Sequence, residues 1–135
     1  MNRYSGSLDA NIVLRLLLND VTDQHQAVLN LLQYHPDQFI VSDTAIIEVV
    51  FVLERHYTFP RSAICEAING LATLPQITCN HTLIEKALPL FIKHITLSFE
   101  DCCLAIYAEL NKALPLWTFD QKLARQVPSA QLVPS

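Results

Sequence analysis

The sequence predicts an α/β fold with three α/β/α layers, in which helices cover a central, mainly parallel sheet of four to five short strands. Short apolar stretches of strand length alternate with longer helical stretches, and this alternation implies crossover connections between parallel strands. The chain has 135 residues, of which 51% are apolar and 16% charged. That length provides one hydrophobic core, and that composition excludes intrinsic disorder. We therefore expect a single domain over residues 1–135.

The first half of the chain begins with an extended segment, and a short strand follows two helices. The stretch from Asn11 is apolar nearly all round, as a helix packed against a sheet would be, and the helix after it has one apolar face. Ser42, Asp43 and Thr44 offer capping oxygens to a third helix. In chain order we expect an extended segment over 3–8, helices over 11–19 and 22–34, a strand over 39–41, and a helix from 42 to about 56.

The second half repeats the alternation of helices and short strands. Pro60 suits the first turn of a helix that Gly70 interrupts or ends, and Ser98 opens another. The expected elements are a helix from 60 to about 70, a strand over 77–79, helices over 82–93 and from 98 to about 112, a strand over 116–119, a short helix over 120–126 and an edge strand at 132–133.

Cysteine spacing, hydropathy and charge predict a cytoplasmic protein. The four cysteines show no C-x-x-C spacing, and the adjacent pair Cys102 and Cys103 lies in an apolar run, so we expect free thiols in a reducing compartment. No stretch approaches the ~20 apolar residues of a membrane span, and no basic-then-apolar leader opens the chain. A net charge of −4 argues against a broad basic surface that grips duplex DNA.

Acidic residues directly follow two of the expected strands. Asp9 comes after the first strand and Asp120 after the fourth, and each begins the helix that follows. Open parallel sheets bind ligands beyond the carboxyl ends of their strands, so both positions are candidates for chemistry. The alternative is that each residue is an ordinary helix cap or first-turn acid.

Glu48 is harder to explain as an ordinary surface residue. It is the only charge in the run AIIEVVFVL, and none of its helical neighbours three or four positions away can neutralise a carboxylate. Burying an unpaired carboxylate is costly, so this side chain must reach water, a cation or a distant base. A functional cleft is the interpretation we favour.

Asp101 has a strong structural explanation. In the stretch SFEDCCLA, Ser98 and Asp101 match the S-x-x-[DE] capping-box pattern, and Glu100 adds a favourable charge at the helix start. A cap would also fix the carboxylate at the mouth of the helix. Capping and function can therefore coexist at this position.

The four carboxylates together predict a metal site, because they can all converge on one edge of a parallel sheet. Like charges repel by about 4 kcal/mol per pair at about 4 Å with an effective dielectric near 20, so a cation is needed among them. Carboxylates without Cys or His alongside are hard oxygen ligands, which favours Mg²⁺ or Mn²⁺ over zinc. The histidines show no H-x-x-x-H pattern, and we interpret them as surface groups or as groups with satisfied hydrogen bonds. One or two such ions typically act on phosphate esters.

Several stretches in order carry a resemblance to a known family: LDANIVLRLL, VSDTAIIEVVFVLE, SFEDCCLAIYAE and LWTFDQKLAR. The chain resembles PIN-domain ribonucleases from Leu8 to about Ala124, most closely the VapC-type toxins of bacterial toxin–antitoxin pairs. The resemblance implies a PIN-like parallel sheet between helices, divalent-metal-dependent cleavage of single-stranded RNA, and frequent homodimers. It also implies an antitoxin partner that inserts a peptide into the acidic site.

The resemblance assigns roles to individual residues. The family's acidic metal site, which is also its catalytic site, falls on the four acids Asp9, Glu48, Asp101 and Asp120. Asn11 matches the Asn of the family's D-x-N opening. Thr118 matches the hydroxyl residue of its T-x-D ending, which would hydrogen-bond within the site.

The predicted function is therefore a Mg²⁺- or Mn²⁺-dependent endoribonuclease that cleaves phosphodiester bonds with a metal-activated water. Arg15, Arg55 and Lys122 are candidates to contact RNA phosphates, and a plain solvated position is the alternative for each. We expect an RNA substrate, a cognate antitoxin and a homodimer, and no association with membranes.

Other classes of protein also place acids at strand ends. A receiver-type phosphoacceptor domain needs a Lys after its last strand, and the segment LVPS supplies none. A haloacid-dehalogenase-type site needs D-x-D after the first strand, and position 11 is Asn. A non-catalytic PIN-like module that binds RNA or protein stays open as the alternative.

Overall fold

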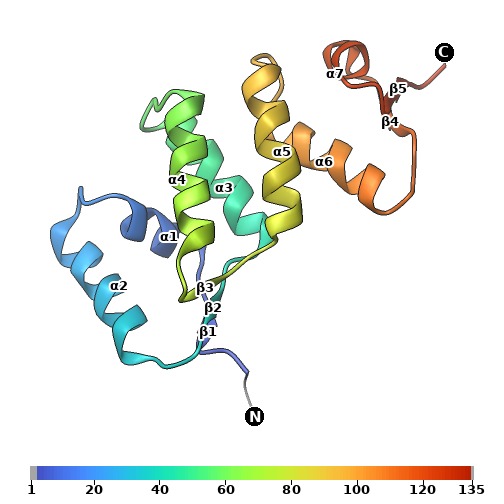
Figure 1. Cartoon of the computed structure of the whole chain (residues 1–135). Helices are drawn as coiled ribbons and strands as arrows, with labels where there is room; N and C mark the ends of the chain where they lie inside the picture. The colour runs from blue at the N-terminus through green and yellow to red at the C-terminus, as the bar shows by residue number, and fades with distance from the viewer. Residues whose placement is uncertain (1–2, 135) are drawn as a thin grey trace. The chain divides into compact units, whose positions relative to one another are not determined.

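A computed structural model describes residues 3–134 of the chain, and residues 1, 2 and 135 lie outside the described part. The chain divides into two compact units, Met1–His81 and Thr82–Ser135, which are described one at a time. Figure 1 shows the elements of both units in chain order. Whether the two units make up the single domain expected over residues 1–135 stays a prediction.

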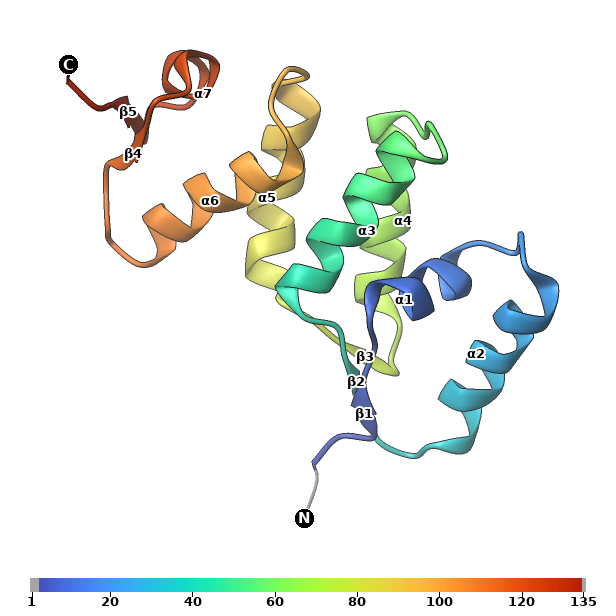
Figure 2. The same cartoon turned by 180° about the vertical axis from the view of Figure 1, so that it is seen from behind.

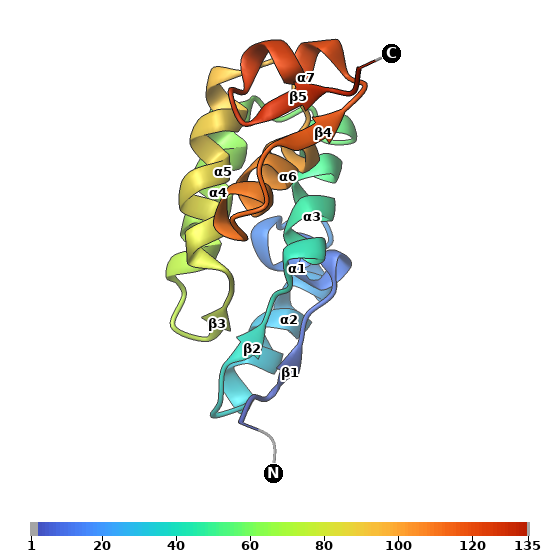
Figure 3. The same cartoon turned by 90° about the vertical axis from the view of Figure 1, so that its right-hand side faces the viewer.

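The first unit combines helices with a parallel three-stranded sheet. The strands pair in the order β1-β2-β3 (Figure 3), and in this register Gly6 lies opposite Phe39 and Phe39 opposite Ile77. The backbone N–H of Leu8 donates to the carbonyl of Ile40 at 2.9 Å, which continues the pairing to the residue before Asp9. The elements are β1 (Gly6–Ser7), α1 (Ala10–Leu17), α2 (Thr22–Tyr34), β2 (Phe39–Ile40), α3 (Asp43–Arg55), α4 (Arg61–Thr73) and β3 (Ile77–Thr78).

Buried apolar residues on α1, α3 and α4 form the core of this unit. α3 contacts both α1 and α4, and Figure 2 shows α1 beside α3. Val13 on α1, Val49 and Leu53 on α3, and Ile64 and Ile68 on α4 are fully buried. Their spacing of three or four residues gives each helix one apolar face, and burying those faces fixes the helices against each other.

The second unit carries the remaining helices and a parallel strand pair. β4 pairs with β5, with Leu116 opposite Ala130, and α7 contacts both strands. The ring of Phe91 on α5 meets Phe99 on α6 edge to face, with ring centres 5.5 Å apart. The elements are α5 (His81–Lys93), α6 (Phe99–Leu110), β4 (Leu116–Thr118), α7 (Gln121–Gln126) and β5 (Ala130–Leu132).

The structure confirms the predicted α/β class, with short parallel strands among many helices. Several bounds shift by one to three residues, and two of these differences have a clear structural reason. α4 runs through Gly70 to Thr73, because Ile68 and Leu71 anchor it on both sides of the glycine. β5 covers Ala130–Leu132 rather than 132–133, since its register follows its pairing with β4.

The described cysteines and helices bear on two further expectations. Cys65, Cys79, Cys102 and Cys103 are all free thiols, and the last two are buried. Within residues 3–134, no helix combines the length and the apolar character needed to cross a membrane.

Candidate functional site

Asp9 lies between β1 and α1 and caps the helix. Its backbone is extended, and its Oδ1 accepts a hydrogen bond from the N–H of Ile12 at 2.9 Å. Within the described residues its second carboxylate oxygen has no hydrogen-bond partner, and the residue is exposed. The cap therefore holds the carboxylate in place while one oxygen stays available to a ligand.

Glu48 projects from the middle of α3 into solvent. Val49 and Val50 beside it are buried, while Glu48 itself is exposed and forms no ion pair or hydrogen bond with any described residue. The helix thus buries most of its apolar positions and leaves this carboxylate at the surface, without a partner among residues 3–134.

Asp9 and Glu48 line the same cavity in the first unit, with a volume of about 500 Å³. Asn11, which the resemblance places in the site, lines it as well. The walls come from α1, from α3 and from the turn after α3, and their residues are Asp9, Ala10, Asn11, Leu14, Arg15, Glu48, Val52, His56 and Tyr57. Two acidic residues and an asparagine thus line one cavity.

Asp101 lies in the first turn of α6, in the second unit. The N-cap is Ser98, whose Oγ accepts a hydrogen bond from the backbone N–H of Asp101 at 3.0 Å. The reciprocal bond of a full capping box, from the Ser98 N–H to the Asp101 carboxylate, is not formed in the described structure. The half-buried Asp101 carboxylate therefore accepts no hydrogen bond from the cap residue Ser98.

Asp120 caps α7, also in the second unit. Its Oδ1 accepts hydrogen bonds from the N–H groups of Lys122 at 2.8 Å and Leu123 at 3.2 Å. Thr118 at the end of β4 accepts a hydrogen bond from the Asp120 N–H through its Oγ1, at 2.9 Å. The hydroxyl of Thr118 thus fixes the backbone that carries the Asp120 carboxylate.

The donor atoms in the first unit fit a hard divalent cation. Among the described residues, Glu48 has no partner for its carboxylate, Asp9 keeps one oxygen free, and no cysteine lines their cavity. Oxygen donors of this kind suit Mg²⁺ or Mn²⁺. Taking either unit by itself, residues 3–134 contain no group of three or more His, Cys, Asp or Glu side chains arranged to hold a metal ion. Each unit supplies two of the four predicted acids.

The predicted phosphate-contacting residues have different surroundings. Arg15 lines the cavity and pairs with Asp20, whose Oδ1 lies 3.0 Å from Arg15 Nη1. Arg55 lies over the ring of Phe51, with its guanidinium carbon 5.7 Å from the ring centre. Lys122 is exposed at the start of α7. Of these three cations, the described cavity with the two acids contains only Arg15.

His56 and Tyr57 also line the cavity, although neither belongs to the predicted site residues. Val52 and His56 lie four and eight positions after Glu48, so they share its face of the helix. That spacing is the signal that could have found His56. Tyr57 follows the helix, and no periodic pattern reaches it.

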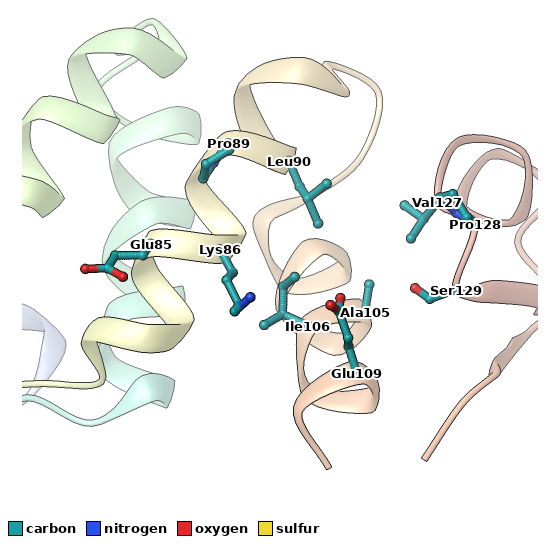
Figure 4. A pocket seen from close by; sticks show the side chains of 10 residues that line it. All are labelled: Glu85, Lys86, Pro89, Leu90, Ala105, Ile106, Glu109, Val127, Pro128 and Ser129. Atoms are coloured by element: carbon teal, nitrogen blue, oxygen red, sulfur yellow. The ribbon is translucent and has the colours of Figure 1, made fainter. Parts of the chain in front are cut away.

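A second cavity, of about 350 Å³, lies in the second unit among α5, α6 and the segment after α7. Figure 4 shows its lining: Lys86 and Leu90 project from α5, Ile106 and Glu109 from α6, and Val127 and Ser129 lie across from them. Neither Asp101 nor Asp120 lines it. This cavity is therefore separate from the predicted acids of the second unit.

Parallel strands followed directly by acid-capped helices define the class of protein, an α/β protein with carboxylates at its strand ends. The family model of the PIN domain matches residues 7–127, and the chain belongs to that family. PIN domains are generally nucleases and typically use divalent metal ions. No curated protein matches the chain as a relative.

Proposed function

We propose that the chain is a Mg²⁺- or Mn²⁺-dependent endoribonuclease of the VapC toxin type that hydrolyses phosphodiester bonds in single-stranded RNA. One observation carries the proposal: Asp9 and Glu48 line one cavity, and each offers carboxylate oxygen that no described residue uses. The Glu48 carboxylate is exposed within the apolar run AIIEVVFVL, and its contacts with the described residues reveal no role in folding. A cation ligand is the role that its chemistry fits.

In the proposed site, Asp9 and Glu48 hold the metal ion, with Asn11 beside them. Asp101 and Asp120 complete the ligand set, as their match to the family pattern implies. The ion, when bound, polarises the phosphate and lowers the pKa of water.

The chain's own residues supply positioning. The N-cap bond to Ile12 fixes Asp9, and the bonds to Lys122 and Leu123 fix Asp120, so neither carboxylate has to be ordered when substrate arrives. One carboxylate of the set orients the attacking water by accepting its hydrogen bond. Arg15, Arg55 and Lys122 contact the phosphates of the RNA backbone.

A partner protein and a second copy of the chain are also part of the proposal. Several large apolar side chains of the described residues are exposed, among them Phe51 at 55% and Ile95 at 75%. Exposed apolar surface favours association with an antitoxin or with another copy. Light scattering at micromolar concentration should give the mass of a dimer, and a monomer would contradict that part of the proposal.

The test combines Mn²⁺ binding by calorimetry with cleavage of single-stranded RNA in Mg²⁺, in Mn²⁺ and with chelator. Asp9→Asn, Glu48→Gln, Asp101→Asn and Asp120→Asn should each lower cleavage on the order of a hundredfold, because loss of about 2.7 kcal/mol of transition-state stabilisation has that effect. Glu66→Gln is the matched control for the first unit and Glu100→Gln for the second, because both glutamates are exposed.

Stability measurements separate a lost ligand from a lost cap. Asn also caps helices, so the free energy of unfolding of Asp9→Asn should lie within about 0.5 kcal/mol of the wild-type value. Asp9→Ala loses the cap, and its free energy of unfolding should be lower by about 1 kcal/mol. Full cleavage by both Asp9→Asn and Asp120→Asn would overturn the assignment. Mn²⁺ binding without cleavage of any RNA would favour a non-catalytic binding module.

A further inference from the structure

Arg15 shares the cavity with Asp9 and Glu48 but pairs with neither of them. Its guanidinium binds two other groups: Nη1 lies 3.0 Å from Asp20 Oδ1, and Nη2 donates to the Tyr57 hydroxyl at 3.0 Å. The Arg15 side chain is only 13% exposed, so the guanidinium is packed in this position.

The helix geometry alone would favour a different arrangement. Arg15 lies four residues after Asn11, on the same face of α1, and side chains on a helix lean toward its N-terminus. That end of α1 carries Asp9, and Glu48 lines the same cavity without a protein partner. A free guanidinium here would be attracted to both carboxylates and would compete with a cation for their oxygens.

Tyr57 and Asp20 close a triangle of hydrogen bonds around the guanidinium. The Tyr57 hydroxyl accepts from Arg15 and donates to Asp20 Oδ2 at 2.8 Å. The hydrogen bond that Arg15 donates to the Tyr57 hydroxyl is the main cause that raises the pKa of Arg15, and the hydrogen bond that this hydroxyl donates to Asp20 is the main cause that lowers the pKa of Asp20. Both charged forms are therefore favoured in this arrangement.

The Tyr57 ring is itself held in place. It meets Phe59 edge to face, with ring centres 6.3 Å apart, and its backbone N–H donates to the Val52 carbonyl at 3.3 Å. The next residue, Thr58, has a left-handed backbone with φ 51°, an uncommon state for a residue other than glycine. The turn after α3 thus aims the hydroxyl at Arg15 and Asp20.

We propose that Asp20 and Tyr57 are positioning residues that hold the Arg15 guanidinium away from Asp9 and Glu48, so that these carboxylates stay available to a divalent cation. The inference rests on the proposed metal site in this cavity. It assigns a role to Asp20 and Tyr57, neither of which is among the four predicted metal ligands.

Tyr57→Phe is the sharpest test, because it removes the hydroxyl of the triangle without changing any charge. Titration of the full chain with Mn²⁺ by calorimetry should show affinity about threefold to tenfold weaker, a range set by the hydrogen bonds that are lost. Tyr34→Phe is the matched control, because Tyr34 is 83% exposed and lies elsewhere in the same unit. Its Mn²⁺ affinity should equal that of the wild type.

A double-mutant cycle distinguishes positioning from general damage. In an Arg15→Gln background no guanidinium competes for the carboxylates, so adding Tyr57→Phe should leave Mn²⁺ affinity unchanged. Asp20→Asn should also weaken Mn²⁺ binding, and Arg15→Gln should cancel that effect too. If a thermal melt shows that Tyr57→Phe is poorly folded, Asp20→Asn still provides the test.

Three outcomes would overturn the inference, and they show whether the restraint on Arg15 or the metal site itself is wrong. If the wild type binds Mn²⁺ and Tyr57→Phe and Asp20→Asn bind it equally well, the restraint on Arg15 is wrong and the proposed function stands. The same conclusion follows if Tyr57→Phe weakens binding equally with and without Arg15. If the wild type binds no Mn²⁺ at all, the proposed metal site is wrong and this inference falls with it.

Discussion

Thr118 Oγ1 accepts a hydrogen bond from the backbone N–H of Asp120 at 2.9 Å, while the carboxylate of Asp120 caps α7. These hydrogen bonds connect the end of β4 to the start of α7. The hydroxyl satisfies an N–H group at the helix N-terminus that would otherwise need water. A residue predicted to support the site thus has a measurable role in local structure.

Replacing Thr118 by Val should destabilise the second unit. Val keeps the shape of Thr but leaves the Asp120 N–H without its acceptor, at a cost of about 1 kcal/mol in the free energy of unfolding. Thr118→Ser keeps the oxygen and should retain most of the stability. Denaturant unfolding measures both, with Thr44→Val, an exposed position on α3, as the control for the same chemical change. Equal losses in Thr118→Val and Thr44→Val would contradict this role.

The pKa of Asp20 predicts how stability depends on pH. The hydrogen bond from Tyr57, helped by the charge of Arg15, lowers this pKa below its ordinary value of 3.8. Because the folded state binds this proton more weakly than the unfolded chain, Asp20 contributes stability above pH 3.8, and the contribution disappears as pH falls through the lowered pKa.

Denaturant unfolding of wild type and Asp20→Asn at a series of pH values checks this expectation. The wild type should be the more stable protein at pH 7, and the difference should shrink as the pH falls from 3.8 through the lowered pKa of the folded state. Added salt should reduce the difference as well, since Asp20 is exposed. If the stability difference between wild type and Asp20→Asn is the same at every pH, the negative charge of Asp20 does not contribute to stability.

The free thiols of Cys65 and Cys79 should react slowly in the native protein. Burial raises the pKa of both thiols, and the nearby charge of Asp43 raises that of Cys79 further. Because the thiolate is the reactive form, modification by DTNB at pH 8 should be about tenfold slower or more than in denaturant. Rapid reaction of one or two thiols per chain in the native state would contradict this prediction.

Local signals in the sequence predicted the helix starts well. Ser42 Oγ accepts from the Ala45 N–H at 3.2 Å and Ser98 Oγ from the Asp101 N–H at 3.0 Å, as their sequence positions indicate. A cap depends on residues three positions apart, so a short stretch of sequence contains all the information needed. The register of β5 could not be read in this way, because it depends on β4 more than ten residues away.

The site shows the same division between local and distant information. Asp9 and Glu48 were found from their positions at a strand end and in an apolar helix, and the structure places both at one cavity. The contact of Arg15 with Tyr57 joins residues 42 positions apart, and no periodicity or motif connects them. His56 was within reach of the helical spacing from Glu48 but was read as a surface residue.

Glu48 differs from Asp9 and Asp120 in its contribution to the stability of the fold. The two aspartates cap helices, so a screen that selects only for folded protein would reject many replacements at both positions. At position 48 such a screen would accept almost any hydrophilic side chain, since the carboxylate touches nothing that holds the chain together. If a library of variants is selected once for folded protein and once for catalysis, the residues accepted by the two selections should therefore differ most at position 48.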